Sequence, residues 1–142
     1  LPVWAKLSPC AGDIVDAART AQDAGVQAVV CANTYWGMAL QADGSSRLGS
    51  MVGGLSGPAI KPVAVRMVYQ VAQTVKVPVI GMGGICNAED ALEFILAGAT
   101  AVAIGTANFH NPYATVETVD GIRDYMVKNG IQDIRELIGA VR

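Results

Sequence analysis

The chain has 142 residues, of which 52% are apolar, 15% are charged and 6% are aromatic, and its formal net charge is −2. This balance excludes a disordered chain, which needs low hydrophobicity and a high net charge. The length is typical of a single domain. The near-neutral charge leaves no basic stripe with interleaved aromatic residues, so the composition also argues against a nucleic-acid partner.

Cysteine usage and hydropathy indicate the cellular compartment in which the protein is expected. Cys10, Cys31 and Cys86 stand at wide spacings without a CxxC pair, and His110 is the single histidine. The pattern supports neither a disulfide framework nor a metal site, and it fits reduced thiols. No apolar run reaches the roughly 18 residues of a membrane span, and no basic and apolar leader opens the chain. We therefore expect a cytoplasmic protein that does not bind a membrane.

The first half of the chain contains two strand-helix units. Residues 2–7 form a short apolar run that ends at Ser8-Pro9, which is typical of a buried strand closed by a turn. Asp13 stands at the N-cap of a helix whose apolar residues recur at helical spacing until Gly25. The second unit has a strand, a polar and glycine-rich loop, and a helix: residues 28–33, 35–57 and 62–75.

The second half repeats the pattern. A third strand over 77–81 precedes a helix that ends at Gly98. A fourth strand over 101–105 leads to helical patterns at 116–129 and 131–141. All four strands are apolar through their centres, which predicts parallel strands covered by helices.

The four consecutive units predict an α/β fold. Residues 24–29 return weakly as 97–102, a helix end running into a strand each time, and such repeats are typical of a TIM (β/α)8 barrel. A complete barrel needs about 250 residues and eight units. We therefore predict that residues 1–142 are a single partial domain, half of a barrel, and that the chain is a fragment. An open doubly wound sheet is the alternative. Four open strands expose two edges, so we also expect a partner half or a homo-oligomer.

Glycines at the predicted carboxyl ends of two strands are candidates for anion binding. Ligands bind at this end of the strands in barrels. Gly83-Gly84 follows the third strand and Gly105-Thr106 follows the fourth. Glycine lets backbone N–H groups approach an anion, so the two pairs predict a phosphate site. Tight turns without a ligand are the structural alternative.

Polar side chains follow the first two strands. Lys6 lies near the end of a strand that looks buried, where an unpaired ammonium group would be costly, so we expect an anionic or electron-rich ligand beside it. A lysine that reaches solvent is the alternative. Asn33 and Thr34 offer neutral donors and acceptors suited to a small polar heterocycle, or they form an ordinary turn. Ser56 lies in a glycine-rich loop without the G-x-S-x-G spacing, which disfavours a serine hydrolase.

Five motifs stand in one order along the chain: residues 3–9, 33–34, 53–62, 81–85 and 105–109. Together they closely resemble the C-terminal half of the class 1 dihydroorotate dehydrogenases, especially the NAD-linked type. The resemblance covers the whole chain. It implies an oxidoreductase of pyrimidine biosynthesis that uses FMN to oxidise dihydroorotate to orotate, with the chain as the C-terminal half of its barrel.

The resemblance also implies roles for single residues. The implied cofactor-binding residues are Lys6, Gly57, Gly83, Gly84, Gly105 and Thr106, and the implied substrate-binding residues are Asn33 and Thr34. Lys6 would contact the flavin ring, and Gly57 would line it through its backbone. The two glycine pairs, with Thr106, would hold the FMN phosphate. The asparagine and threonine would hydrogen-bond the pyrimidine.

The family's catalytic base is a cysteine in the N-terminal half, so the resemblance implies no catalytic residue in this chain. Cys10 stands where relatives commonly carry asparagine or threonine, and it is not that base. We expect the chain alone not to turn over dihydroorotate. An iron-sulfur FAD subunit that transfers electrons to NAD is the implied partner. A dihydropyrimidine dehydrogenase-like FMN module and a non-catalytic, self-associating half-barrel are the alternatives.

Overall fold

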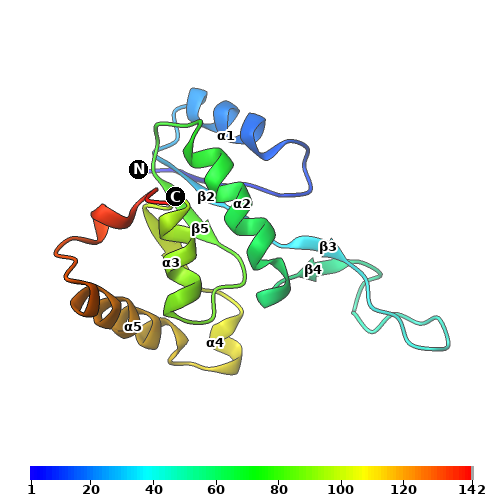
Figure 1. The fold of residues 1–142 in the computed structure, drawn as a ribbon. Coiled ribbons are helices and arrows are strands. Elements are labelled where there is room, and N and C mark those ends of the chain that lie inside the picture. Colours follow the sequence, from blue (N-terminus) through cyan, green and yellow to red (C-terminus); the bar gives the residue numbers. More distant parts are fainter. Residues whose placement is uncertain (142) are drawn as a thin grey trace.

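A four-stranded parallel sheet forms the centre of the computed structural model, which describes residues 1–141 (Figure 1). The strands are β1 (Trp4–Lys6), β2 (Ala28–Cys31), β5 (Val79–Met82) and β6 (Ala101–Ala103). They lie side by side in the order β1-β2-β5-β6, which is also their order along the chain. Because crossovers between parallel strands are right-handed, a steady advance in one direction places every connecting helix on the same face.

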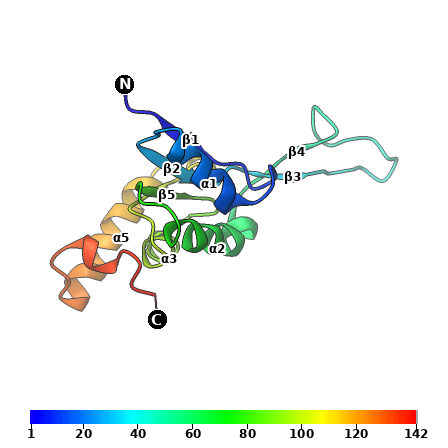
Figure 2. The same ribbon diagram turned by 90° about the horizontal axis from the view of Figure 1, so that it is seen from above.

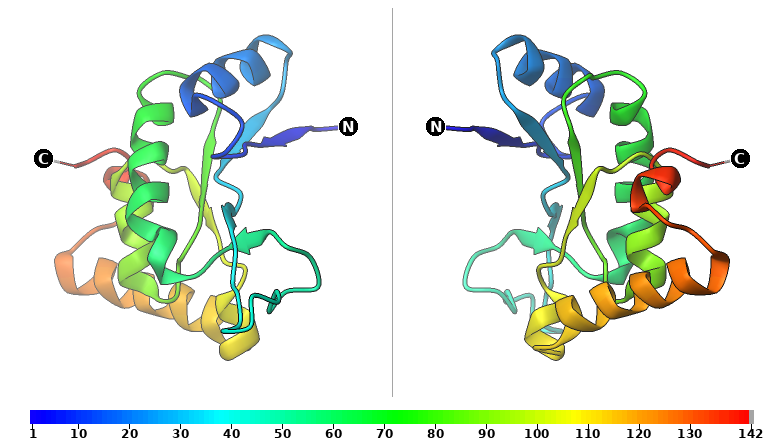
Figure 3. Two further views of the ribbon diagram at one scale, coloured as in Figure 1. Left: turned by 90° about the vertical axis from the view of Figure 1, so that its right-hand side faces the viewer. Right: turned by 90° about the vertical axis from the view of Figure 1, so that its left-hand side faces the viewer.

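Three helices cover that one face: α1 (Ile14–Asp23), α2 (Lys61–Ala72) and α3 (Ala88–Leu96). The other helices are α4 (Ala107–His110) and α5 (Ala114–Asn129), and the 3₁₀ turns are η1 (Pro58–Ile60) and η2 (Ile134–Leu137). Figure 3 shows α2 and α3 on one side of the strands. The helix α5 packs on α3. Along residues 1–141, no helix is both long and apolar enough to cross a membrane.

The main core lies between the sheet and these helices. Val29 and Cys31 of β2 are fully buried, as are Val68 of α2 and Phe94 of α3. Side chains alternate along a strand, so the neighbouring positions of β2 face the opposite way. On that opposite face, Val30 belongs to a second, smaller apolar cluster that is made only of strand residues. A doubly wound sheet carries helices on both faces, and the one-sided cover therefore argues against that alternative.

Helix caps explain where two helices begin. Asp13 caps α1, because its Oδ1 accepts the N–H groups of Val15 and Asp16 at 2.8 and 3.1 Å. This confirms the N-cap predicted from the sequence. Asn87 caps α3 in the same way by accepting the N–H of Asp90 at 2.9 Å. Both caps satisfy donors that the first helical turn leaves without partners.

Two segments differ from the prediction. The expected loop 35–57 contains an antiparallel ribbon of β3 (Tyr35–Gly37) and β4 (Gly53–Leu55), which extends away from the sheet in Figure 2. The expected helix over 131–141 is wrong, because only η2 forms there. Gly130 ends α5 with a φ of 67°, and Gly139 with a φ of 72° interrupts the chain again soon after η2. The segment between these two glycines is therefore long enough for only one short turn.

The outer strands are less covered than their apolar sequences suggest. Trp4 is 62% exposed, and the side chain of Lys6 is exposed as well. Both lie on β1, at the edge of the sheet. The expectation that Lys6 is buried is therefore wrong. Trp4 and Lys6 are two positions apart and pair with Ala28 and Val30, so they lie on the face without helices, whereas Ala5 between them packs against the main core.

Candidate functional site

The carboxyl ends of the parallel strands surround an open cavity of about 140 Å³. This volume is smaller than that of a complete small-molecule site, which is usually about 300–1,000 Å³. All eight residues singled out from the sequence line the cavity: Lys6, Asn33, Thr34, Gly57, Gly83, Gly84, Gly105 and Thr106. The structure therefore brings together segments that are far apart in the chain.

One wall of the cavity comes from the ends of β1 and β2. Parallel pairing places Lys6 beside Val30, and the N–H of Asn33 donates to the carbonyl oxygen of Leu7 at 2.9 Å. The lysine and the asparagine are thereby held at neighbouring strand ends. Within residues 1–141, no carboxylate forms an ion pair with Lys6. Its ammonium group thus provides a positive charge at the cavity.

The opposite wall contains the turn after β5. Gly83 and Gly84 have φ values of 132° and 79°, in the region that favours glycine. A Cβ atom on Gly84 would lie 2.7 Å from the carbonyl oxygen of Gly57. The chain therefore needs glycine at position 84 to bring these two backbone segments together at the cavity.

The turn after β6 completes this wall. The Thr106 hydroxyl donates to the Ser56 hydroxyl oxygen at 2.9 Å, which joins the turn to the segment after β4. A Cβ atom on Gly105 would meet no atom within 4 Å, and the φ of this glycine lies outside the left-handed region. The described fold therefore does not require glycine at 105, although the residue lines the cavity. Space for a close ligand is a physical reason for glycine there.

Several residues that line the cavity have backbone donors without a protein partner. In the described part of the chain, the N–H groups of Gly83, Gly84, Gly105 and Thr106 donate to no protein acceptor. Gly105 is exposed, but the other three residues are half-buried, where backbone donors normally have a partner. Four such donors on residues that line one cavity are a suitable set for the oxygens of an anion.

The cavity also has an apolar part that sequence reasoning missed. Ile60, Met82 and Ala103 line it. Met82 and Ala103 are paired in register on β5 and β6, on the side that carries the second cluster. The alternation of Ile80 and Met82 along β5 is the signal that could have identified them. A cation, anion donors and an apolar surface together suit a flat ring with an anionic tail.

The sequence is similar to those of known proteins. A family model described as Dihydroorotate dehydrogenase matches residues 1–126. The chain belongs to the dihydroorotate dehydrogenase family. The family match confirms the resemblance seen in the five motifs, and it gives no support to a dihydropyrimidine dehydrogenase-like module.

Three curated relatives illustrate the similarity to the dihydroorotate dehydrogenase family. The chain is 57% identical to a protein of Lachnoclostridium phytofermentans over 142 residues, which is 99% of this chain and 47% of the relative. It is 57% identical to one of Alkaliphilus oremlandii (97% and 46% covered) and 56% identical to one of Desulforamulus reducens (99% and 46%). Each is named dihydroorotate dehydrogenase B (NAD(+)), catalytic subunit. The chain spans about half the length of these relatives.

Proposed function

We propose that residues 1–142 form one partial domain, the C-terminal half of a (β/α)8 barrel. Three observations support this architecture. The strand order advances in one direction, the helices cover one face, and the second cluster lies on the other face, where a barrel has its interior. A complementary half or a second copy of the chain would then cover the open edges at β1 and β6, in line with a homo-oligomer.

We propose FMN as the cofactor of this site. These residues fit FMN. The fold does not require glycine at position 105, so the space beside it is open to a ligand. Four backbone N–H groups have no protein acceptor and can donate to a phosphate. Gly83, Gly84, Gly105 and Thr106 would hold the phosphate. Lys6 would place its positive charge beside the ring, and Gly57 would line the ring through its backbone. FMN, when bound, supplies the acceptor for a hydride.

We propose that the reaction served by the site is the oxidation of dihydroorotate to orotate in pyrimidine biosynthesis. The names of the relatives support this substrate. Asn33 and Thr34 line the cavity beside Lys6, and their donors and acceptors suit the polar edge of a pyrimidine. The NAD-linked catalytic subunits named above imply a partner subunit, and we propose an iron-sulfur FAD protein in that role.

The observation that carries the proposal is the convergence of eight residues from separate segments on one cavity. A titration of the purified chain with FMN, followed on a sizing column by visible absorbance, tests it. We expect the yellow cofactor to elute with the protein and riboflavin, which lacks the phosphate, to bind more weakly. A colourless protein peak with both ligands would contradict cofactor binding by this chain.

A titration of the FMN-loaded chain with orotate tests the substrate separately. We expect orotate to perturb the flavin absorbance, and Asn33→Ala to weaken this effect by about tenfold, the loss expected for hydrogen bonds worth about 1.5 kcal/mol. An unchanged response in the variant would show that Asn33 does not bind the pyrimidine.

A further inference from the structure

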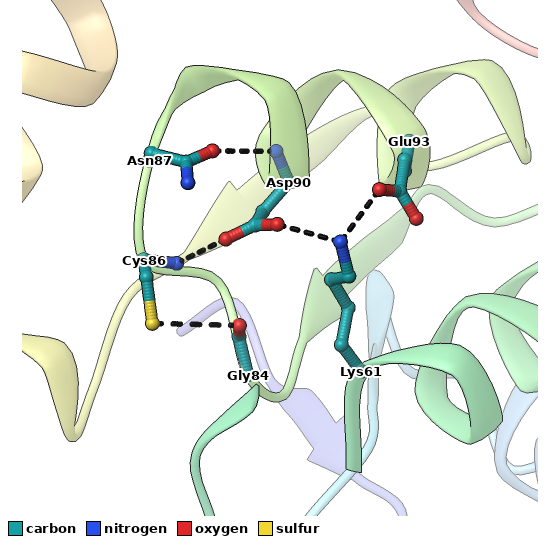
Figure 4. Close-up of polar contacts among 6 residues, drawn as sticks. All are labelled: Lys61, Gly84, Cys86, Asn87, Asp90 and Glu93. Carbon is teal, nitrogen blue, oxygen red and sulfur yellow. Dashed lines mark hydrogen bonds and ion pairs between the residues drawn. The ribbon is translucent and has the colours of Figure 1, made fainter. Parts of the chain in front are cut away.

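An ion-pair cluster lies behind the glycine turn, outside the cavity lining (Figure 4). Lys61, the first residue of α2, donates from Nζ to Asp90 Oδ1 and to Glu93 Oε1, both at 2.6 Å. We call these three residues the Lys61 cluster. The side chains of Lys61 and Asp90 are only 23% and 13% exposed. The pair is therefore better shielded from solvent than an ordinary surface salt bridge.

The carboxylate of Asp90 connects the lysine to the turn. One oxygen accepts from Lys61, and the other, Oδ2, accepts the backbone N–H of Cys86 at 2.9 Å. Cys86 stands two residues after Gly84, and Figure 4 shows its backbone directed at the carboxylate. The Asp90 backbone is itself fixed, because its N–H donates to the Asn87 side chain. Both carboxylate oxygens are thus used to join α2 to the turn.

The same two segments are also in direct contact. A Cβ atom on Gly84 would lie 2.9 Å from the Cβ and 3.0 Å from the backbone nitrogen of Lys61. Gly57, which lines the cavity, lies four residues before Lys61, and its carbonyl oxygen is the closest atom to that position. The glycine turn therefore rests on the start of α2, and the Lys61 cluster holds the two together from behind.

We propose that Lys61 is a positioning residue for the anion site: through Asp90 it holds the turn 83–86 against Gly57, so that the N–H groups of Gly83 and Gly84 stay at the cavity. This inference rests on the proposed function, because the anion is the phosphate of FMN. Lys61 itself is outside the cavity lining. The two carboxylates raise the pKa of Lys61 to about 12, so the link persists at neutral pH.

A comparison of FMN with riboflavin tests the role, because the two ligands share the ring and only FMN has the phosphate. Lys61→Met keeps most of the length of the side chain and removes its charge. We expect the Kd for FMN to rise about tenfold, the change that corresponds to one lost hydrogen bond to a charged group, and the Kd for riboflavin to change less than twofold. Lys61→Arg keeps the positive charge, so we expect this variant to retain most of the affinity of the parent chain for FMN.

Arg123→Met provides the matched control. Arg123 and Asp120 form an ion pair at 2.7 Å, but both side chains are more than half exposed and the pair lies on α5. We expect this variant to bind FMN and riboflavin like the parent chain. Equal weakening of both ligands by Lys61→Met would overturn the proposal, because a general loss of structure does not discriminate a phosphate.

A second measurement does not need a ligand. We expect amide hydrogen exchange at Cys86 to accelerate about tenfold or more in Lys61→Met and in Asp90→Ala, since local opening becomes easier when a partner is lost, and to be unchanged in Arg123→Met. Unchanged exchange at Cys86 in both variants would overturn the positioning role. If the parent chain binds no FMN, the proposed function fails in this chain, and the exchange result alone decides whether Lys61 holds the turn.

Discussion

Replacement of Gly105 by alanine separates what the fold needs from what the ligand needs. The residue lines the cavity, yet a Cβ atom there would meet no protein atom within 4 Å, and its backbone is not left-handed. The added methyl group therefore costs the protein nothing in contacts or strain. Gly→Ala at such a position reduces the entropy of the unfolded chain and raises the free energy of unfolding by about 0.4–1 kcal/mol.

The bound cofactor would experience the opposite effect. A methyl group forced into a packed contact costs about 1–3 kcal/mol. Since 1.4 kcal/mol corresponds to a factor of ten, the Kd for FMN is expected to rise about 5- to 150-fold in Gly105→Ala. Urea unfolding measures the first quantity, and a titration of flavin fluorescence measures the second.

Gly84→Ala is the informative comparison. Its φ of 79° is unfavourable for alanine, and its Cβ atom would lie 2.7 Å from the Gly57 carbonyl oxygen. Strain of this kind costs about 1–3 kcal/mol, so this variant is expected to lose both stability and affinity. The reasoning about Gly105 would be refuted if Gly105→Ala bound FMN as tightly as the parent chain, or if it unfolded at clearly lower urea concentration.

Three further predictions concern the core, the thiols and the C-terminal turn. Phe94→Ala is expected to lower the free energy of unfolding by about 3–5 kcal/mol in chemical denaturation, because the side chain is fully buried. Burial raises the pKa of the Cys31 thiol to about 12, so a thiol reagent at pH 8 should modify the two exposed cysteines quickly and Cys31 only after unfolding. The hydrogen bonds from Arg135 lower the pKa of Asp133 to about 2. The Asp133 carboxylate caps η2 by accepting the N–H of Arg135 at 2.9 Å. This cap should therefore stabilise the turn fully above the ordinary pKa of 3.8 and lose its effect as the pH falls towards 2, and Asp133→Asn should abolish this dependence in amide exchange.

Local signals account for the parts of the fold that the sequence predicted well. The cap at Asp13 depends on contacts within three residues. The placement of the site depends on a single further principle, that the carboxyl ends of parallel strands meet at one edge. Each of Lys6, Asn33 and the glycine pairs follows or ends a parallel strand, so this principle predicts that they lie together. The structure places all of them in the lining of one cavity.

Other features depend on contacts between distant segments. The exposure of Lys6 follows from its place on the face of the sheet that no helix covers, which apolar content alone does not reveal. The ribbon of β3 and β4 forms across a loop whose strands have only three residues each, too short for a clear alternation. The link between Lys61 and Asp90 joins residues 29 positions apart, and no periodic pattern predicts such a pair.

The geometry of the cavity explains why such a link matters. The proposed anion donors are backbone groups, so no side-chain substitution can adjust them directly, and their direction depends on how each turn is supported. The turn after β5 is supported by the segment before α2, which enters from the ribbon and not from a neighbouring strand of the sheet. Sheet hydrogen bonds therefore cannot fix the distance between Gly57 and Gly84. The direct contact of Gly84 with the start of α2 and the side chains behind the turn hold it instead, and among the described residues Lys61 and Asp90 are the charged pair that joins these two segments.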